Sequence, residues 1–424
     1  MEIRSTTDQD LEVYIDTALS AFGRFRESPA EGDGFMWSAY EMDRNLLAVT
    51  ADGRPVGTAG AYSFELTLPG EVVVPVTGVT GVGVMPSHRR QGVLSALMRH
   101  QLTEFRARGE SVSVLLASEA TIYGRFGYGP ATYTRQLTVP RHRTAFATPR
   151  AAAAAAVGAV ADSPATGSDS GWDSGWDSGS VELLRRPECG EILEEVYDRY
   201  RRALPGALSR PHRWWASGAG RPPVSFERRF VAVHRDADGV PDGYASYSRT
   251  STETLTVDEI IATDDAVTTA LARFALGHDL VAEVVFKHLA PDDVLRWRLA
   301  DFRAGQVGED TDWLWVRLLD IPGALTARGW FSDGELVLDV DDPFLGEHGR
   351  YLLTVRDGKA VCVPTDREPD LSLDVRDLGS VYLGGTAPGT LVRAGHIRAH
   401  RPGAAALADA LFRAERPPHC LHWF

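Results

Sequence analysis

The chain has 424 residues, of which 44% are hydrophobic, 9% aromatic and 24% charged, a composition typical of soluble globular proteins. This length is enough for about three domains of ordinary size. Acidic side chains outnumber basic ones by 58 to 44, and the formal net charge of −14 argues against a general binder of nucleic acids or anionic membranes, while cationic substrates stay open.

The start of the chain and its cysteines indicate the cellular compartment. Residues 1–12 lack the apolar core of a secretory signal, and no stretch is apolar over the ~18 residues that a membrane-spanning helix needs. Cys189, Cys362 and Cys420 are odd in number and far apart, so they predict neither a disulfide framework nor a metal site. We therefore expect a cytoplasmic protein without a metal, and without a membrane or nucleic-acid partner.

Residues 1–147 are predicted to form a mixed α/β domain. In chain order, the predicted elements are a helix near residues 9–25, strands at 46–51, 59–68 and 72–84, a helix at 92–108, and strands at 111–116 and 131–139. The second helix has a one-sided apolar stripe at helical spacing, which includes Val93, Leu97 and Leu102.

Residues 148–180 are predicted to be a low-complexity linker or loop. They contain six consecutive alanines and a doubled Gly-Trp-Asp-Ser unit at 171–178. Such a composition cannot bury enough apolar surface to offset the entropy of ordering the chain. The two tryptophans leave a docking motif as the alternative interpretation.

The rest of the chain is predicted to hold two further segments, 181–300 and 301–424. In the first, strands are expected at 230–234, 244–250, 254–262 and 281–286, with helices at 265–276 and 292–299. In the second, strands are expected at 313–318, 335–340, 351–356, 359–364 and 371–375, with helices at 321–328, 376–383 and 403–412. The order of elements in 181–300 repeats the plan of 1–147.

The segment from Thr80 to Leu94 carries the clearest indication of function. An apolar strand ends there in a short basic loop, which opens a long helix. Backbone N–H groups at a helix start have no partner within the helix, and the helix dipole is positive there. Arg89 and Arg90 add charge, and Gly92 lets a phosphate approach the backbone, so the loop fits a pyrophosphate. The alternative is a plain strand-to-helix turn whose arginines face solvent.

Two motifs resemble the GNAT superfamily of N-acetyltransferases. Arg89-x-x-Gly92-x-Leu94 is similar to its acetyl-CoA loop, Gln/Arg-x-x-Gly-x-Gly/Ala, from which Leu94 departs. Tyr123 stands four residues before a Gly-aromatic pair, as in that family, where the tyrosine hydroxyl protonates the departing CoA thiolate. A packing role for Tyr123 and a rival donor, Tyr128, are the alternatives. An unperturbed tyrosine pKa of about 10 suits a proton donor.

Over nearly the whole chain the sequence resembles one branch of the superfamily, the enhanced intracellular survival (Eis) acetyltransferases. The strings that carry this resemblance are residues 69–75, 122–131 and 378–385, together with the terminal Phe424. The resemblance implies an α/β (α+β) fold with tandem GNAT-like domains and a sterol-carrier-protein-like domain. The expected ranges are a catalytic domain at 1–147, the linker at 148–180, a second GNAT-like domain at 181–300 and the sterol-carrier-like domain at 301–424.

The resemblance also implies the site residues. The expected acetyl-CoA-binding residues are Val82, Gly83, Val84, Arg89, Arg90, Gln91, Gly92, Val93, Leu94, Ser95, Ser118 and Glu119. Tyr123 is the expected general acid. The predicted strand 72–84 has no Asp, Glu or His, so the expected base is the family's terminal carboxylate, here on Phe424. Trp37 is assigned either to an aromatic amine pocket or to the core.

The second GNAT-like segment is not expected to bind CoA. Its strand-to-helix junction reads Ala262-Thr263-Asp264-Asp265-Ala266, without glycine or arginine, and its two aspartates suit a helix cap but repel an anion. Near the end of the chain, His419, Cys420 and His422 do not have the spacing of a standard metal site.

We therefore expect an acetyl-CoA-dependent N-acetyltransferase that acetylates primary amines by direct transfer. The resemblance points to aminoglycosides, polyamines or lysine side chains as substrates, and to a homohexamer. The alternative is a non-catalytic scaffold or binding protein whose sterol-carrier-like domain holds an apolar ligand.

Overall fold

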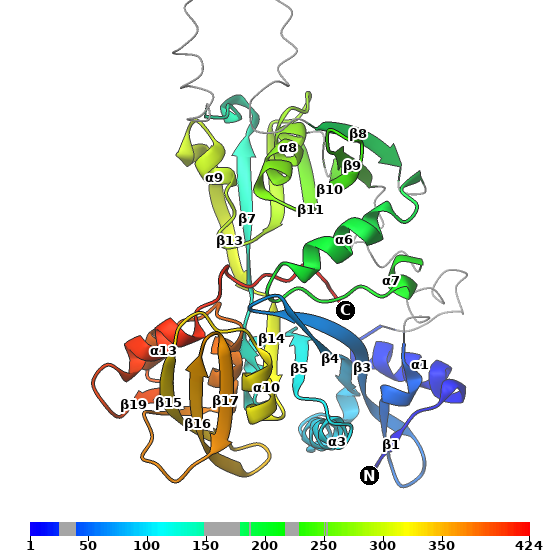
Figure 1. The fold of residues 1–424 in the computed structure, drawn as a ribbon. Coiled ribbons are helices and arrows are strands. Elements are labelled where there is room, and N and C mark those ends of the chain that lie inside the picture. Colours follow the sequence, from blue (N-terminus) through cyan, green and yellow to red (C-terminus); the bar gives the residue numbers. More distant parts are fainter. Residues whose placement is uncertain (25–39, 148–178, 186–187, 217–228, 250, 252) are drawn as a thin grey trace, which may run out of the picture. The chain divides into compact units, whose positions relative to one another are not determined.

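The computed structural model describes residues 1–24, 40–147, 179–185, 188–216, 229–249, 251 and 253–424 (Figure 1). The chain divides into two compact units. The first comprises Met1–Tyr133, Arg201–Arg221 and Asp312–Phe424, and the second Thr134–Tyr200 and Pro222–Thr311. Two predictions, Trp37 and residues 148–178 of the linker, lie outside the described residues.

The first unit contains a seven-stranded sheet in the order β1-β2-β3-β4-β5-β14-β6. Its strands are β1 (Glu2–Ser5), β2 (Leu46–Val49), β3 (Pro55–Leu68), β4 (Val72–Val84), β5 (Val112–Leu116), β6 (Gly129–Pro130) and β14 (Leu314–Leu318). Its helices are α1 (Leu11–Ala21), α3 (Val93–Ala107) and α4 (Ala120–Tyr123), with short 3-10 turns η1 (Asp8–Asp10), η2 (Met42–Arg44), η3 (Pro86–His88) and η4 (Gly124–Phe126). All neighbouring strands are antiparallel except β4 and β5, which are parallel.

The local elements of this domain follow the sequence pattern. The strand predicted at 72–84 is β4, and the helix predicted at 92–108 is α3. The first helix is shorter than expected. Residues 8–10 form the 3-10 turn η1, and the α-helix α1 begins at Leu11 and ends at Ala21. Alternation and helical periodicity are local properties of the sequence, so they place these elements closely.

Two strands exchange between the sheets, which the sequence did not indicate. The strand predicted at 131–139 is β7 (Tyr133–Pro140), and it pairs with β12 (Glu283–Leu289) in the second sheet. In return, β14 enters the first sheet between β5 and β6. Both strands lie close to a predicted domain boundary, and periodicity carries no information about which distant strand pairs with which.

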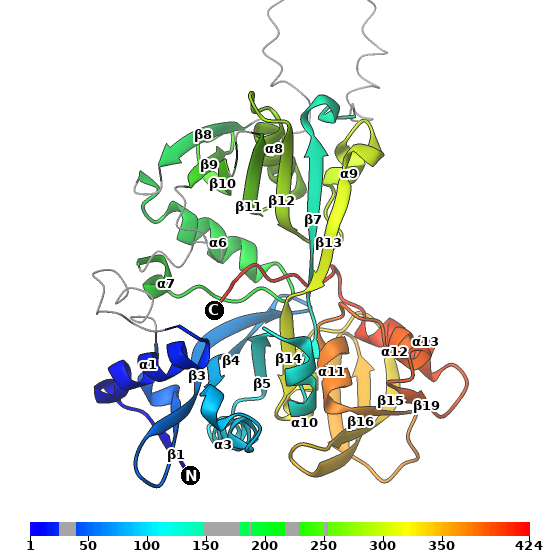
Figure 2. The same cartoon turned by 180° about the vertical axis from the view of Figure 1, so that it is seen from behind.

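The second unit repeats the plan of the first sheet, in the order β13-β7-β12-β11-β10-β9-β8 (Figure 2). Its remaining strands are β8 (Ser180–Arg185), β9 (Phe230–Arg235), β10 (Pro241–Arg249), β11 (Thr254–Ala262) and β13 (Gln306–Asp312). Its helices are α6 (Ile192–Arg202), α8 (Asp265–Leu276) and α9 (Leu295–Arg298), with 3-10 turns η5 (Arg141–Arg143) and η7 (Phe302–Ala304), whereas α7 (His212–Ala216) belongs to the first unit. As in the first sheet, one pair is parallel, β11 with β12.

The C-terminal domain, which belongs to the first unit, is built on a five-stranded sheet in the order β17-β16-β15-β18-β19. Its strands are β15 (Gly334–Asp342), β16 (Glu347–Arg356), β17 (Lys359–Pro364), β18 (Leu371–Asp374) and β19 (Arg398–Ala399). Its helices are α10 (Ile321–Ala327), α11 (Val375–Tyr382), α12 (Pro388–Arg393) and α13 (Ala404–Phe412).

The C-terminal domain shares a continuous core with the first sheet. One cluster of buried side chains runs from Leu66 and Val114 through Val316 to Leu338 and Leu378. The two parts of the first unit are therefore held together by packed apolar surface rather than by a tether.

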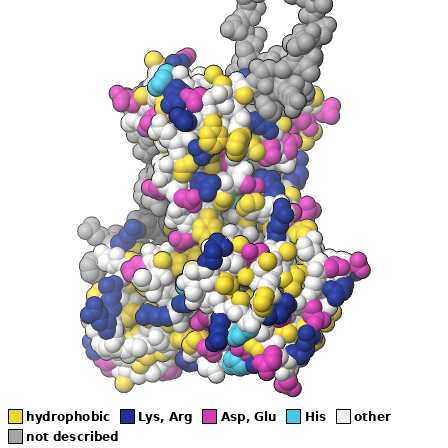
Figure 3. Space-filling model, turned by 90° about the vertical axis from the view of Figure 1, so that its left-hand side faces the viewer, with side chains coloured by type: hydrophobic (Ala, Val, Ile, Leu, Met, Phe, Trp, Pro, Cys, Tyr) yellow, Lys and Arg dark blue, Asp and Glu magenta, His cyan; other side chains and the backbone are white. Residues whose placement is uncertain are grey.

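The surface carries both signs of charge. On the face shown in Figure 3, basic and acidic side chains are interspersed. No helix in the described part of the chain is both long and apolar enough to cross a membrane.

Candidate active site

Strands β4 and β5 separate at the centre of the first sheet. They pair only from Thr77 to Val79 of β4, and β4 then runs on to Val84. A register shift against β3 leaves Gly81 and Val82 opposite the single residue Ala59. Such a bulge re-aims the backbone. The far end of β4 therefore presents backbone N–H and C=O groups to the gap beside β5.

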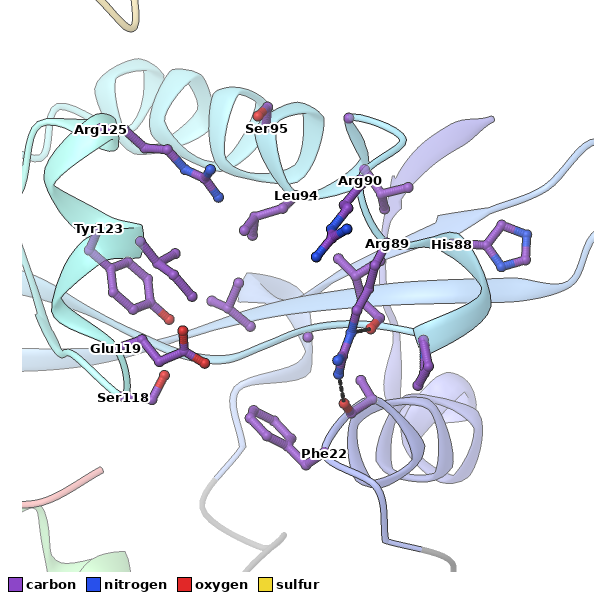
Figure 4. A pocket seen from close by; sticks show the side chains of 18 of the residues that line it. Phe22, His88, Arg89, Arg90, Leu94, Ser95, Ser118, Glu119, Tyr123 and Arg125 are labelled. Carbon is purple, nitrogen blue, oxygen red and sulfur yellow. Dashed lines mark hydrogen bonds between the residues drawn. The ribbon is translucent and has the colours of Figure 1, made fainter.

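A cavity of about 850 Å³ lies at this gap (Figure 4). The end of β4, the start of α3, the end of α1 and α4 contribute its walls. Its lining residues are Ala21, Phe22, Gly23, Val82, Gly83, Val84, Pro86, His88, Arg89, Arg90, Gly92, Val93, Leu94, Ser95, Ser118, Glu119, Ile122, Tyr123 and Arg125. The volume lies in the range of ~300–1000 Å³ that is usual for small-molecule sites.

One side of the cavity is a site for anions. Gly92 precedes α3 with a left-handed φ of 82°, and the first N–H groups of that helix have no partner within it. Arg90 is also left-handed, at φ 61°, which is uncommon outside glycine. Its exposed side chain points into the cavity, as does that of Arg125 on the far side (Figure 4). Cationic side chains and free N–H groups thus converge where a phosphate would lie.

Arg89 plays a different part from the one expected. Its Nη2 donates to the carbonyl oxygen of Ala21 at 2.8 Å, and its Nε donates to that of Val84 at 3.3 Å. A cation at the end of α1 also suits the helix dipole. Arg89 therefore ties the basic loop to α1 as well as lining the cavity.

The other side of the cavity carries the tyrosine motif. Tyr123 is 8% exposed at the end of α4, with the side chains of Ser118 and Glu119 beside it (Figure 4). Burial raises the pKa of Tyr123 above its usual 10, a hydrogen bond with Ser118 opposes this shift, and the charge of Glu119 adds to it. The hydroxyl consequently stays protonated through the neutral range and suits a proton donor.

The rival tyrosine lies outside this cavity. Tyr128 is completely buried, and its hydroxyl shares a 2.8 Å hydrogen bond with Ser113 Oγ. Burial raises its pKa strongly. The two rings contact edge to face, with centroids 6.4 Å apart, but only Tyr123 reaches the cavity.

The structure brings together most of the residues expected for the site. Tyr123 and all the expected acetyl-CoA residues except Gln91 line the one cavity. Gln91 is exposed, and its Nε2 donates to the carbonyl oxygen of Ser87 at 3.3 Å. Phe22 and Arg125 were not expected. Arg125 lies inside the tyrosine motif, where its charge was a usable signal, whereas no local pattern marks Phe22.

The C-terminal tail reaches the same strand β4, but not the cavity lining. The Phe424 ring packs edge to face on Phe64 at 5.0 Å, and a Cβ at Gly78 would lie 2.9 Å from the Phe424 ring. Gly78 belongs to the short stretch where β4 still pairs with β5. The tail thus ends beside the point where the two strands separate.

Side chains of the first unit hold this tail in place. Arg210 donates to the carbonyl oxygen of Leu421 at 3.4 Å, and Trp313 Nε1 donates to that of His422 at 3.3 Å. The His422 ring is buried between Phe64 and Trp214, with centroids about 5 Å away. Burial, with the charge of Arg210, lowers the pKa of His422 well below 6.5, so the imidazole is neutral.

The chemistry of the tail does not resemble a metal centre. The described residues hold no group of three or more His, Cys, Asp or Glu side chains that is arranged to bind a metal ion. The three cysteines are buried, and none of them forms a disulfide within the part of the chain that the structure describes.

The second unit lacks the anion site at the matching junction. Asp264 caps α8, and its carboxylate accepts from the backbone N–H groups of Ala266 and Val267 at 2.8 and 2.9 Å. The bulge is kept, but it falls at Asp258, which is buried and paired with Arg229 and Lys287. In the first copy the backbone N–H groups at the start of α3 face the cavity. In the second copy the matching N–H groups at the start of α8 already donate to the carboxylate of Asp264.

Comparison with known proteins agrees with this architecture. Residues 2–131 and 206–318 each match a model of the acetyltransferase (GNAT) domain, and residues 321–421 match the sterol carrier protein domain. The predicted fold class, tandem GNAT domains followed by a sterol-carrier-like domain, is thereby confirmed.

Proteins that are similar over most or all of the chain are named N-acetyltransferases. The N-acetyltransferase Eis of Mycobacterium tuberculosis is 35% identical over 371 residues, covering 85% of this chain and 84% of its own. An uncharacterized N-acetyltransferase of Streptomyces griseus is 35% identical over 432 residues, 99% of each chain. The crystal structure of Eis1 from Mycobacterium abscessus matches with a TM-score of 0.82 and 32% identity, over all of both chains. The chain belongs to the Eis family of N-acetyltransferases, within the GNAT superfamily.

Proposed function

We propose that the protein transfers the acetyl group of acetyl-CoA directly to a primary amine, with Tyr123 as general acid and the Phe424 carboxylate as general base. The observation that carries this proposal is the single cavity in which a protonated, buried tyrosine faces a cationic helix start. Its volume of about 850 Å³ and its converging donors suit acetyl-CoA as substrate.

Different residues along the cavity bind different parts of acetyl-CoA. Arg90 and the first N–H groups of α3 hold the pyrophosphate, and Arg125 neutralises phosphate charge from the opposite wall. The edge of β4 from Val82 to Val84, which does not pair with β5, aligns the pantetheine arm in the manner of an added strand. Ser118 and Glu119 line the slot beside Tyr123.

The transfer itself proceeds by attack of the amine nitrogen on the acetyl carbonyl carbon. A C–N bond forms, and the tetrahedral intermediate collapses with cleavage of the C–S bond. The thiolate takes the hydroxyl proton of Tyr123, and the carboxylate of Phe424 takes the proton that the ammonium nitrogen loses. Positioned acid–base groups of this kind contribute about 10²–10⁴-fold to a rate.

Replacing Tyr123 by Phe tests the acid. We expect kcat to fall about 100-fold or more, while the Kd for acetyl-CoA stays within about twofold, because the ring and its packing are kept. Release of the CoA thiol measures kcat, and calorimetry measures Kd. The matched control is Tyr128→Phe, which removes a buried hydroxyl outside the cavity. Normal kcat in Tyr123→Phe, or a loss confined to Tyr128→Phe, would remove Tyr123 from this role.

Extending the chain past Phe424 tests the base. A short Gly-Ser extension moves the carboxylate away from β4, so we expect kcat to fall at least tenfold with unchanged binding of acetyl-CoA. The same extension before Met1 is the control. Full activity of the C-terminally extended protein would show that the carboxylate takes no part.

The substrate class follows from the family resemblance and from charge. An acidic protein with an anionic group at its reaction centre suits a cationic amine. We propose aminoglycosides, polyamines and lysine side chains as the panel for the thiol-release assay. If acetyl-CoA binds but no amine is acetylated, the scaffold hypothesis replaces this one.

We also propose that the protein is cytoplasmic and forms a homohexamer. Light scattering of the purified protein tests the homohexamer.

A further inference from the structure

The turn that carries Tyr123 is seated against the C-terminal domain. Gly127 has a left-handed φ of 80°, and a Cβ there would lie 1.6 Å from Nη1 of Arg317 and 2.8 Å from Val375. A Cβ at Gly129 would lie 2.0 Å from the carbonyl oxygen of Arg376. The residues after Tyr123 therefore pack closely against β14 and α11. There is no room for a side chain at Gly127 or Gly129.

A buried ion pair fixes this turn. Arg317 on β14 is completely buried, and its Nη1 donates to the carbonyl oxygen of Phe126 at 2.5 Å. Its Nη2 donates to the carboxylate of Asp342, which ends β15 in the C-terminal domain and is itself buried. The guanidinium thus joins the backbone of the tyrosine turn to a carboxylate on another domain.

The same stretch of the C-terminal domain also packs on the turn. Asp342 Oδ1 accepts from the backbone N–H of Leu345 at 3.1 Å, which shapes the turn between β15 and β16. Phe344, in that turn, contacts the ring of Phe126 edge to face at 4.9 Å, and the guanidinium of Arg99 on α3 lies 4.6 Å from the Phe344 ring. Phe126 is therefore held through its carbonyl by Arg317 and through its ring by Phe344.

From this arrangement we propose that Asp342 is a positioning residue for Tyr123, acting through Arg317, and that the sterol-carrier-like domain serves the acetyl transfer by this contact. The inference rests on the proposed role of Tyr123 as general acid. Asp342 touches neither the cavity nor the tyrosine, so it acts only by fixing the turn.

The physical reason lies in the charge of Arg317. A buried guanidinium that loses its carboxylate must draw in water or move, because an uncompensated buried charge is costly. Either response releases the carbonyl of Phe126, three residues after Tyr123. Displacing a catalytic group by about 1 Å can cost 10²-fold in rate, while the phosphate site at α3 stays intact. The expected signature is a loss in kcat without a change in KM for acetyl-CoA.

A double-mutant cycle between Asp342→Asn and Tyr123→Phe tests the proposal in the full-length enzyme. We expect Asp342→Asn to lower kcat about tenfold or more with the KM for acetyl-CoA within twofold. In the Tyr123→Phe background it should lower kcat by less than twofold, because a residue that acts through the hydroxyl has no effect once the hydroxyl is gone. Equal losses in both backgrounds, or no loss in the wild-type background, would overturn the proposal.

The matched control is Glu347→Gln. Glu347 also joins the C-terminal domain to the first sheet, through a bidentate pair with Arg106 of α3 at 2.5 and 2.7 Å, but it makes no contact with the tyrosine turn. We expect its kcat to be unchanged. A loss in Glu347→Gln equal to that in Asp342→Asn would assign the effect to general loosening between the domains and overturn the proposal.

A gentler variant covers the case in which Asp342→Asn does not fold. Phe344→Leu keeps an apolar side chain but removes the ring contact with Phe126. We expect a kcat loss of severalfold that again disappears in the Tyr123→Phe background, and a kcat equal to wild type would contradict the proposal. The Tyr123→Phe enzyme separates the two hypotheses: if it is fully active, the proposed acid fails whatever Asp342 does, and if its kcat is reduced but measurable, the cycle judges Asp342 alone.

Discussion

At the scale of single residues, the basic loop separates two arginines that are neighbours in sequence. The guanidinium of Arg89 donates hydrogen bonds to the carbonyl oxygens of Ala21 and Val84. Arg90, held at φ 61°, makes no ion pair or hydrogen bond with any residue that the structure describes, and its side chain points into the cavity. The sequence predicts the charge of the loop, but the backbone conformation decides which cation is available to a ligand.

Replacing Arg90 by Ala therefore weakens the binding of acetyl-CoA. A hydrogen bond to a charged group contributes about 1.5–3 kcal/mol, so we expect the Kd to rise about tenfold or more, with an unchanged melting temperature. Calorimetric titration measures the Kd. Arg54→Ala, at an exposed arginine outside the cavity, is the control and should bind normally. Normal binding by Arg90→Ala would exclude the proposed phosphate contact.

At the scale of elements, the C-terminal tail depends on an imidazole that stays neutral. His422 is 1% exposed among aromatic rings, and its Nε2 has no hydrogen-bond partner among the residues that the structure describes. In the unfolded chain the same imidazole binds a proton near pH 6.5. The folded pKa lies below the unfolded one, so the unfolded state binds more protons as the pH falls below 6.5, and folding is then disfavoured.

Acidification should accordingly destabilise the wild-type protein more than a variant that lacks this imidazole. Until the pH reaches the lowered folded pKa, one such group costs about 1.4 kcal/mol for each pH unit below 6.5. We expect the free energy of unfolding, from urea titration at pH 7.5 and pH 5.5, to fall more in wild type than in His422→Gln. Equal losses in the two proteins would mean that His422 does not govern the acid response.

At the scale of the whole molecule, the two copies of one sheet plan differ at the junction between the strand and the following helix. Both copies keep the bulge and the parallel pair, but Asp264 occupies the helix N–H groups in the second copy, and Asp258 fills its bulge with a buried ion pair. The second copy thus contributes β14 to the first sheet and receives β7 in its own sheet.

Calorimetric titration of the full chain should therefore give one acetyl-CoA per chain. Asp264→Ala frees the helix N–H groups of the second copy but supplies no arginine, so we expect the same stoichiometry in that variant. Two molecules of acetyl-CoA bound per wild-type chain would contradict the prediction that the second copy does not bind CoA.

The residue pattern was enough to predict the local elements, and the family resemblance was enough to predict the fold class and most of the cavity lining. Strand β4, helix α3 and the Tyr123 motif are each encoded within a short window, where periodicity and residue type act directly. The ranges assigned to the three domains, and the catalytic roles of Tyr123 and Phe424, remain predictions.

Which distant segments meet could not be predicted from the sequence and is known from the folded structure. The exchange of β7 and β14, the separation of Arg89 from Arg90, the burial of Tyr128 and the link from Asp342 through Arg317 to the tyrosine turn all depend on pairs far apart in sequence. Such pairings are selected by the packing and hydrogen bonding of the assembled chain, and neither composition nor spacing records them. The composition predicted a polar, acidic, multidomain protein, and the packing determined where in it one tyrosine is buried, protonated and held in place.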